Sequence, residues 1–148
     1  MSDLDKSIKT KFRNDKHRML ANIVFTSNWL KNSMTEFITP FGLSHQQFNI
    51  LRILRGKGEW MTMNDIKKVM IDKSPHTTRM VTKLLDKGWV NRKQGTKDRR
   101  VVYVKITQTG LNLLTEIDKM EIDVVSFLDK ISDDEAKQVN ELLDRMRG

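Results

Sequence analysis

The chain has 148 residues, a length that fits one domain with a sizeable hydrophobic core. It contains no cysteine, which excludes disulfides, thiolate metal sites and cysteine redox switches. No apolar run approaches the roughly 18 residues that a membrane-spanning helix needs, and residues 1–6 lack the order of a secretory signal. We therefore expect a soluble, cytoplasmic protein without a membrane partner.

The net charge of +8 is concentrated in one part of the chain. Residues 60–106 carry 12 Lys or Arg against 4 Asp or Glu, whereas residues 107–148 carry 5 basic against 10 acidic residues. Such segregation predicts a positive field over one face, as a polyanion partner requires. A basic surface that only aids solubility is the alternative, and charge alone does not separate the two.

Apolar side chains at steps of three and four predict one long first helix over residues 8–38. A helix of about 30 residues measures roughly 45 Å, more than a domain of this size can cover, so we expect part of it to pack on a second copy of the chain. Its exposed start, with Ile8 and Phe12, is alternatively a frayed terminus. Pro40 and Gly42 are expected to end it.

Ser44 opens a second helix, because Gln47 follows three residues later in the arrangement of a capping box. Gly56 and Gly58 are expected to end this helix, and residues 60–61 form a candidate edge strand. Its expected buried face consists of Phe48, Leu51, Ile53 and Leu54.

Two shorter helices follow. Thr62 is expected to cap the first, which turns Ile66, Val69 and Met70 inward. After a four-residue link, Ser74 is the expected N-cap of a helix that runs to Lys87. Pro75 lies in its first turn and Gly88 follows its end. Two short helices joined by a tight turn are the pattern of a helix-turn-helix.

A basic β-hairpin comes directly after these helices. Residues 89–92 and 101–106 have the composition of strands, and Val102, Val104 and Ile106 share one face of the second strand. Residues 95–98 supply turn chemistry between the strands. Five of the nine residues from 92 to 100 are basic. A helix-turn-helix with a basic hairpin predicts a winged helix.

The last third of the chain is predicted to be helical again. Thr107 caps one amphipathic helix, and Ser132 with Glu135 forms a capping box for the final one. Both are acidic, so they should face away from nucleic acid and, with the first helix, form an association surface. A monomeric helical cap is the alternative. Their apolar stripes consist of Leu111, Leu114, Ile117, Met120, Val124 and Leu128, and of Val139, Leu142, Leu143 and Met146.

Two runs of residues resemble the multiple antibiotic resistance regulator (MarR) family. The first is 78–92, TRMVTKLLDKGWVNR, and the second is 98–110, which is similar to the Asp-x-Arg wing and Thr-x-x-Gly helix start of that family. The resemblance covers about residues 8–147. It implies a homodimeric transcriptional regulator, usually a repressor, with helices from both chain ends interleaved at the dimer interface. Residues 8–40 and 107–148 would then be dimerisation helices, and 43–106 a DNA-binding lobe. We expect a mainly α fold with a small β-hairpin wing: a winged helix-turn-helix with six helices in an interleaved homodimer.

The helix over residues 74–87 would lie in the major groove of double-stranded DNA with its N-terminal residues at base edges. Arginine offers a bidentate fork to guanine, and threonine offers a hydroxyl and a methyl group. The expected base contacts are His76, Thr77, Thr78 and Arg79. Ser74 is expected at the same surface, although Ser74 and Thr77 alternatively only cap the helix or touch phosphate. Thr82 and Lys83 are expected at phosphates.

In the wing, Arg100 is the candidate for insertion into a narrow minor groove, where negative potential is concentrated. Asp98 is better understood as an intramolecular brace for a wing arginine than as a DNA contact. Lys93, Lys97 and Arg99 would neutralise phosphates. A two-fold dimer implies a pseudo-palindromic operator with half-sites about one helical turn apart.

For an effector, the resemblance implies a small anionic aromatic or lipophilic molecule bound between the lobe and the dimerisation helices. An aromatic stripe is alternatively part of the core. The candidate lining residues are Trp29, Phe37, Phe41 and Phe48, with His45 or Arg52 as polar anchors.

No cofactor, metal or enzymatic activity is expected. His17, His45 and His76 are far apart, and no pair has the spacing of metal ligands. The chain lacks a Gly-rich phosphate loop and a nucleophile elbow. Two alternatives to a DNA-binding regulator stay open: a winged helix used for protein contacts, and a small-molecule enzyme without a recognisable motif.

Overall fold

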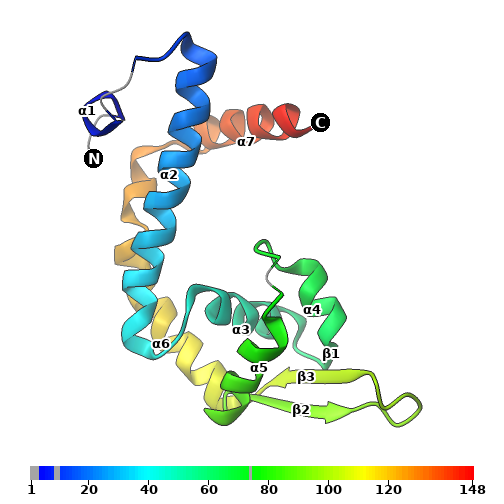
Figure 1. Cartoon of the computed structure of the whole chain (residues 1–148). Helices are drawn as coiled ribbons and strands as arrows, with labels where there is room; N and C mark the ends of the chain where they lie inside the picture. Colours follow the sequence, from blue (N-terminus) through cyan, green and yellow to red (C-terminus); the bar gives the residue numbers. More distant parts are fainter. Residues whose placement is uncertain (1–3, 9–10, 74) are drawn as a thin grey trace.

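The computed structural model describes residues 4–8, 11–73 and 75–148 (Figure 1). Within these residues the fold is mainly helical, with one antiparallel three-stranded sheet in the order β1-β3-β2. The elements are α1 (Leu4–Ile8), α2 (Asp15–Ile38), η1 (Thr39–Phe41), α3 (His45–Lys57), β1 (Met61–Thr62), α4 (Met63–Val69), α5 (Thr77–Asp86), β2 (Val90–Gln94), β3 (Val102–Ile106), α6 (Gln108–Val124), η2 (Ser126–Lys130) and α7 (Asp133–Arg147).

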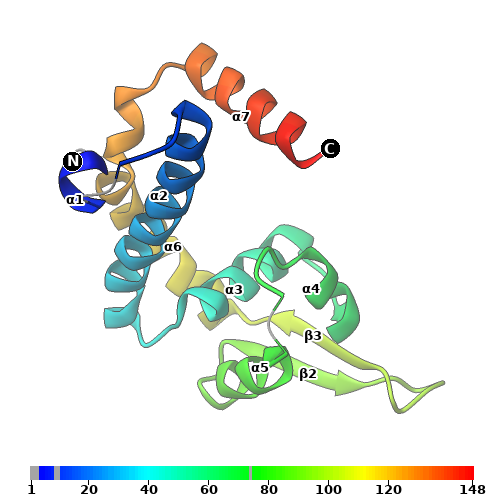
Figure 2. The ribbon, with the colours of Figure 1, turned by 45° about the horizontal axis from the view of Figure 1, so that its top comes forward.

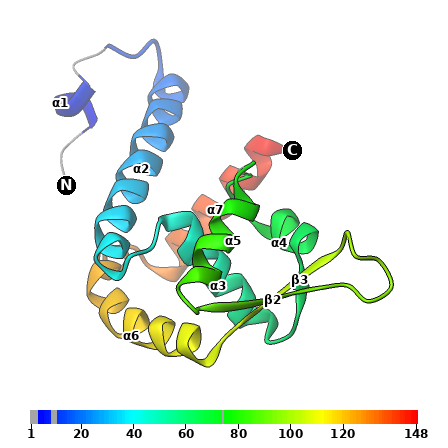
Figure 3. The same cartoon turned by 60° about the horizontal axis from the view of Figure 1, so that its bottom comes forward.

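The chain folds into a lobe and an arm. Helices α3, α4 and α5 gather against the sheet in what we call the winged-helix lobe, residues 45–106 (Figures 1 and 2). Helix α2 and the C-terminal part of α6 run side by side (Figures 1 and 2), and we call α2 together with residues 118–124 the arm. The β2–β3 hairpin projects from the lobe away from the helices (Figure 3). Helix α7 extends from the part of the arm that is remote from the lobe, and it points toward the side of the molecule on which the lobe lies.

The prediction of one continuous first helix over residues 8–38 is wrong. Helix α1 ends at Ile8, and α2 begins at Asp15 behind the extended residue Asn14, whose φ is −164°. The Asn14 side chain accepts a hydrogen bond from the backbone N–H of His17, so it starts a new helix instead of continuing the old one. The described residues therefore contain seven α-helices in place of the six expected.

The end of α2 and the start of α3 follow the sequence prediction. Pro40 lies in the short 3₁₀ helix η1, and Gly42 turns the chain with a φ of 75°. The Ser44 hydroxyl accepts from the Gln47 N–H, and the Gln47 side chain accepts from the Ser44 N–H, which completes the capping box. Helix α3 passes through Gly56 and ends at Gly58, where φ is 69°.

The helix-turn-helix is present, but its boundaries differ from the prediction. Thr62 caps α4 through the Asp65 N–H, while the edge strand covers Met61–Thr62 instead of residues 60–61. Val69 is 55% exposed, so its expected inward orientation is wrong. Helix α5 begins at Thr77 with His76 as the N-cap residue, and Ser74, the cap expected from sequence, lies outside the described residues.

One hydrophobic core joins the lobe to the first half of α6. Every helix of the lobe and the central strand contributes fully buried side chains, and α6 closes the core from the arm side with Leu114 and Ile117. The sheet register pairs Val90 with Ile106 and Arg92 with Val104, so the valine and isoleucine side chains of β3 face the core as predicted. The fully buried apolar side chains of the lobe are Phe48, Ile50, Leu51, Leu54, Ile66, Met70, Val81, Leu84, Val90 and Val104.

The C-terminal helices also start where predicted. Thr107 caps α6 by accepting from the Gly110 N–H, and Ser132 with Glu135 forms the capping box of α7. The backbone and side chain of Ser132 both donate to the Glu135 carboxylate, which lowers its pKa below the ordinary value. Leu128 lies in η2 instead of extending the α6 stripe.

Candidate nucleic-acid interface

Helix α5 is strongly amphipathic and presents one polar face to solvent. Val81 and Leu84 are fully buried and hold the helix on the core. Thr78, Arg79 and Lys83 are exposed on the other side, and His76 is exposed at the helix start. Among the described residues, the candidate recognition side chains are thus at least partly accessible to solvent, with one exception.

That exception is Thr77, which is only 1% exposed. Its hydroxyl lies 3.8 Å from the sulfur of Met70 at the end of α4, so it contacts the other helix of the motif. This position favours the structural alternative for Thr77 over a base contact. Thr82 is half-buried and donates its hydroxyl proton to the Thr78 carbonyl at 3.0 Å.

Asp98 braces the wing arginine, as the sequence suggested. Its Oδ1 accepts from the backbone N–H of Arg100 at 3.0 Å and from Arg100 Nε at 3.2 Å, and its Oδ2 accepts from Nη2 at 3.2 Å. The guanidinium and the backbone N–H of Arg100 hold the pKa of Asp98 below its ordinary value. The Arg100 side chain remains 91% exposed, so the brace orients the guanidinium without burying it.

A hollow of about 580 Å³ connects α4, the start of α5 and the base of the wing. Thr78 and Arg100 both line it, which brings α5 and the wing arginine to one site. Sequence reasoning did not single out Asn64, Lys67 and Arg92, which also line this hollow. The only local signal for the first two is their spacing of three residues, which places them on one face of α4.

Successive side chains of a strand point to opposite faces, and this separates Arg92 from Lys93. Arg92 lies toward the hollow, whereas the Lys93 ammonium is 4.1 Å from the centre of the Trp60 ring and 5.9 Å from that of Tyr103. Lys97 and Arg99 are exposed near the tip of the wing. The basic hairpin therefore offers cations on more than one side.

The candidate effector residues lie in different surroundings. Phe48 is 1% exposed within the core, and Arg52 lies over its ring at 5.4 Å. Trp29 packs against Phe127, and Phe41 packs against Phe37.

Of those residues, His45 lines a large opening between α2 and α7, which we call the α2–α7 groove. Its volume is about 1060 Å³. The lining residues are Lys16, Met19, Asn22, Ile23, Thr26, Ser27, Leu30, Lys31, Met34, His45, Val139, Leu142, Leu143, Arg145 and Met146.

In the described parts of the chain, no helix is both long and apolar enough to cross a membrane. The same residues contain no group of three or more His, Asp or Glu side chains placed to hold a metal ion.

Comparison with known proteins identifies the family. The model of the MarR family matches residues 43–102. The HTH-type transcriptional regulator MhqR of Bacillus subtilis is 30% identical over 120 residues, which cover 79% of this chain and 81% of that protein. The chain belongs to the MarR family. The resemblance found in the sequence is thereby confirmed.

Two further MarR proteins extend this comparison. The multiple antibiotic resistance protein MarR of Salmonella typhimurium is 32% identical over 92 residues, which cover 62% of this chain and 63% of that protein, less than two thirds of its length. A crystal structure of an Escherichia coli MarR mutant in complex with operator DNA superposes with a TM-score of 0.72 at 25% identity and covers 99% of both chains. Of these proteins, MhqR is named as a transcriptional regulator and the Escherichia coli MarR mutant is bound to operator DNA, and none of the three is named as an enzyme.

Proposed function

We propose that this MarR-family chain is a cytoplasmic transcription regulator that binds double-stranded DNA sequence-specifically as a homodimer. The observation that carries the proposal is the single surface formed by α5 and the wing. Thr78 of the exposed α5 face and the braced Arg100 line the same hollow, in the segment that carries the excess of positive charge. Membership in the family supports the same function.

In this proposal α5 enters the major groove with its first turn at the bases. His76, Thr78 and Arg79 are exposed there and supply the donors and acceptors that read base edges. Thr82 and Lys83, a turn later, contact phosphates, as does the chain near Ser74. Thr77 holds α5 against α4 and contributes to recognition through the position of the helix.

The wing binds the adjacent minor groove. Asp98 presents the guanidinium of Arg100, which enters a narrow A·T-rich groove. Lys97 and Arg99 neutralise phosphates beside it, and Lys93 does so from the other face of the hairpin.

The exposed surface of α7 supports the proposed homodimer. None of the residues of this 15-residue helix is buried by its own chain, although isolated helices of that length are marginal in water. Its apolar face and that of α2 border the α2–α7 groove, so helices of a second copy can complete the packing. Residues 8–40 and 107–148 are then the dimerisation helices, and 43–106 the DNA-binding lobe. The exposed large apolar side chains here are Met19, Leu20, Val24, Leu30, Met120, Leu128, Ile131, Val139, Leu142 and Met146.

We further propose that the regulator is a repressor that a small effector releases. The α2–α7 groove has apolar walls, and four of its lining residues are Lys16, Lys31, His45 and Arg145. Apolar walls with a few cationic groups suit an aromatic or lipophilic anion. The helices of the second copy would fill only part of this groove, and the effector would occupy the remainder beside His45, the first residue of α3, next to the lobe that carries α5.

The DNA-binding proposal is tested by selecting bound sequences from a random duplex pool and measuring their affinities. We expect a pseudo-palindromic site whose affinity falls steeply with salt, because several phosphates release counterions. Arg79→Ala should cost about 1–3 kcal/mol at one base position, whereas Arg100→Ala should act at the flanking A·T-rich step. Lys130→Ala, which removes a positive charge from exposed η2, is the matched control and should change affinity little.

If no sequence is enriched, or if Arg79→Ala and Lys130→Ala behave alike, α5 does not read DNA. A winged helix that serves protein contacts then becomes the better explanation.

The dimer is tested separately by sedimentation equilibrium. Leu142→Asp places a charge on the apolar face of α7 that lines the groove and should dissociate the dimer. Asn140→Asp adds the same charge at an exposed α7 residue outside the groove lining and should leave the dimer intact. Equal association of the two variants would contradict the assignment of this face.

A further inference from the structure

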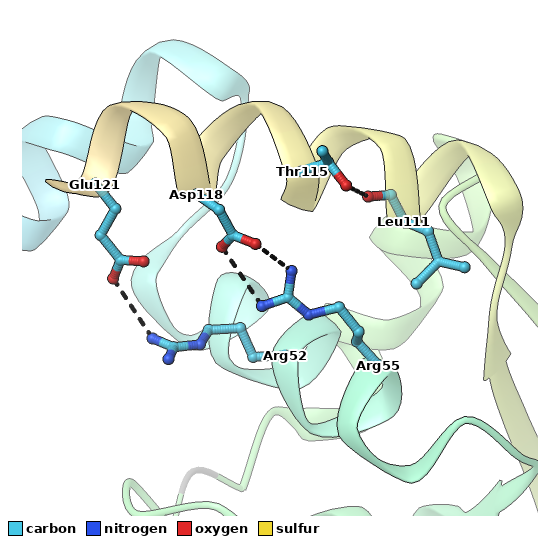
Figure 4. A network of polar contacts seen from close by, with 6 residues as sticks. All are labelled: Arg52, Arg55, Leu111, Thr115, Asp118 and Glu121. Atoms are coloured by element: carbon cyan, nitrogen blue, oxygen red, sulfur yellow. Dashed lines mark hydrogen bonds and ion pairs between the residues drawn. The ribbon is translucent and has the colours of Figure 1, made fainter.

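Two ion pairs connect the winged-helix lobe to the arm (Figure 4). Arg55 of α3 binds Asp118 of α6 through two contacts, Nη1 to Oδ2 at 2.6 Å and Nη2 to Oδ1 at 3.4 Å. One turn away, Arg52 Nη1 lies 3.6 Å from Glu121 Oε1. We call these four residues the α3–α6 clasp.

The four residues of the clasp have the same spacing on both helices, so the two ion pairs can form side by side. The two arginines are three residues apart on α3, and the two carboxylates are three residues apart on α6, so each pair shares one helix face. Arg55 pairs with the earlier carboxylate and Arg52 with the later one, which fixes the direction in which the helices cross. Arg52 is held further by its position over the Phe48 ring, at 5.4 Å from the ring centre.

The clasp lies where the hydrophobic core ends. Leu114 and Ile117 of α6 are fully buried, but Met120, the next residue of that stripe, is 54% exposed. The described part of α6 beyond Ile117 therefore adds no buried apolar side chain to the core, although Ile38 of α2 also joins the arm to it. At the start of the arm, α6 contacts the lobe through the charged pairs of Asp118 and Glu121.

Partly exposed ion pairs add little to stability, so folding does not explain this arrangement. The side chains of Arg55 and Asp118 are 32% and 43% exposed. An arginine that binds a carboxylate through two contacts instead has a defined orientation relative to it, because the planar guanidinium matches the carboxylate only in one orientation.

We propose that the α3–α6 clasp fixes the orientation of the winged-helix lobe on the arm, and thereby the half-site spacing that the dimer accepts. The first part concerns the chain alone, and the second rests on the proposed function. In a two-fold dimer each arm sets the position of its own α5, so a small rotation of the lobe changes the separation of the two recognition helices. Arg52, Arg55, Asp118 and Glu121 are positioning residues in this mechanism, because none of them needs to touch DNA.

The orientation is tested by pulsed electron paramagnetic resonance on the full chain. Because the chain has no cysteine, Asn28→Cys in α2 and Asn91→Cys in β2 attach one spin label to the arm and one to the lobe. The labelled chain is diluted with unlabelled chain so that only distances within one protomer are measured. We expect one narrow distance distribution for the intact clasp and a distribution about twice as broad for Asp118→Asn, with Glu121→Gln in between.

Two controls keep this test specific. Glu59→Gln removes the same charge from the Glu59–Lys105 pair at 3.9 Å, which lies within the lobe and bridges nothing to the arm. It should leave the distribution narrow. The charge exchange Arg55→Glu with Asp118→Arg should restore the narrow distribution lost in Asp118→Asn, which a general loss of packing would not permit. Equal distributions for Asp118→Asn and Glu59→Gln overturn the proposal.

The consequence for DNA is tested with the duplex that the selection enriches and with versions carrying one base pair inserted between half-sites. The unmodified protein and Glu59→Gln should lose roughly tenfold in affinity on insertion, whereas Asp118→Asn should lose less than about threefold. A spacing profile of Asp118→Asn as sharp as that of Glu59→Gln overturns the role in spacing. If instead the distances broaden as expected but no duplex is bound specifically, the proposed function fails while the orienting role of the clasp stands.

Discussion

Replacing Gly110 by alanine tests whether close approach of α6 to the wing, and not helix propensity, determines the residue at this position. A Cβ atom on Gly110 would overlap the carbonyl oxygen of Trp89 and lie 2.8 Å from Cγ1 of Ile106. The same Trp89 carbonyl accepts the Thr107 N–H at 3.0 Å, and the Thr107 hydroxyl donates to Gly88 at 2.7 Å. The overlap therefore falls on the junction that joins α6 to β2.

The expected change in the free energy of unfolding is the sum of two opposing contributions. Alanine in place of glycine favours a helix by about 0.5–1 kcal/mol. Overpacking against a backbone atom that cannot rotate away costs about 1–3 kcal/mol. Gly110→Ala should therefore lower the free energy of unfolding by about 1–2 kcal/mol, measured by urea denaturation at fixed protein concentration.

Gly56→Ala is the matched control because Gly56 also lies in a terminal turn of a helix, and a Cβ there meets no atom within 4 Å. This variant should raise the free energy of unfolding by about 0.5 kcal/mol. If Gly110→Ala stabilises the chain as Gly56→Ala does, the packing argument is refuted. In that case the Thr-x-x-Gly start of α6 needs another explanation.

Three further predictions use the same junction, the wing and the core. Thr107→Val removes the hydroxyl that accepts from Gly110 and donates to Gly88, and should cost about 1–2 kcal/mol in urea denaturation; a neutral result would mean that other groups cap α6. Asp98→Asn should weaken operator binding several-fold in fluorescence anisotropy without unfolding the chain. Because Arg100 lowers the pKa of Asp98, the stabilisation from this carboxylate is present above its ordinary pKa and is lost only as the pH falls through the lowered value. The difference from the unmodified protein should therefore stay constant between about pH 5 and pH 8, and a difference that disappears at pH 6 would contradict this brace. Ile71→Ser should change stability by less than about 0.5 kcal/mol because Ile71 is 94% exposed, whereas Ile66→Ala should cost about 2–5 kcal/mol because Ile66 is fully buried.

The sequence predicted the helix starts well because their signals are local. The capping boxes at Ser44 and Ser132 and the caps at Thr62 and Thr107 join groups three residues apart, so their geometry does not depend on the rest of the fold. Ser74 is different, because the structure begins α5 only at Thr77. The same local logic applies to the first helix, where the cap of Asn14 on the His17 N–H starts α2 although the apolar stripe predicts a longer helix.

Neighbouring residues of one type show what the sequence leaves open. Thr77 and Thr78 were equivalent candidates for base contacts, but one is buried against Met70 and the other is exposed. Their difference depends on the rotation of α5 about its axis, which packing of Val81 and Leu84 determines. Arg92 and Lys93 differ for the corresponding reason, because the register of β2 with β3 decides which side each cation occupies.

By itself, then, the sequence determined the order of the α-helices and strands from α3 onward, most caps, the basic wing and the family, since each of these depends on contacts over a few residues or on composition. Tertiary structure alone decided which cations share the hollow with Arg100, that His45 lines the α2–α7 groove while Phe48 lies in the core, and that Arg55 meets Asp118. The last two residues are 63 positions apart, and no local pattern relates them. Only the packing of α3 on α6 around a common core brings their charges together.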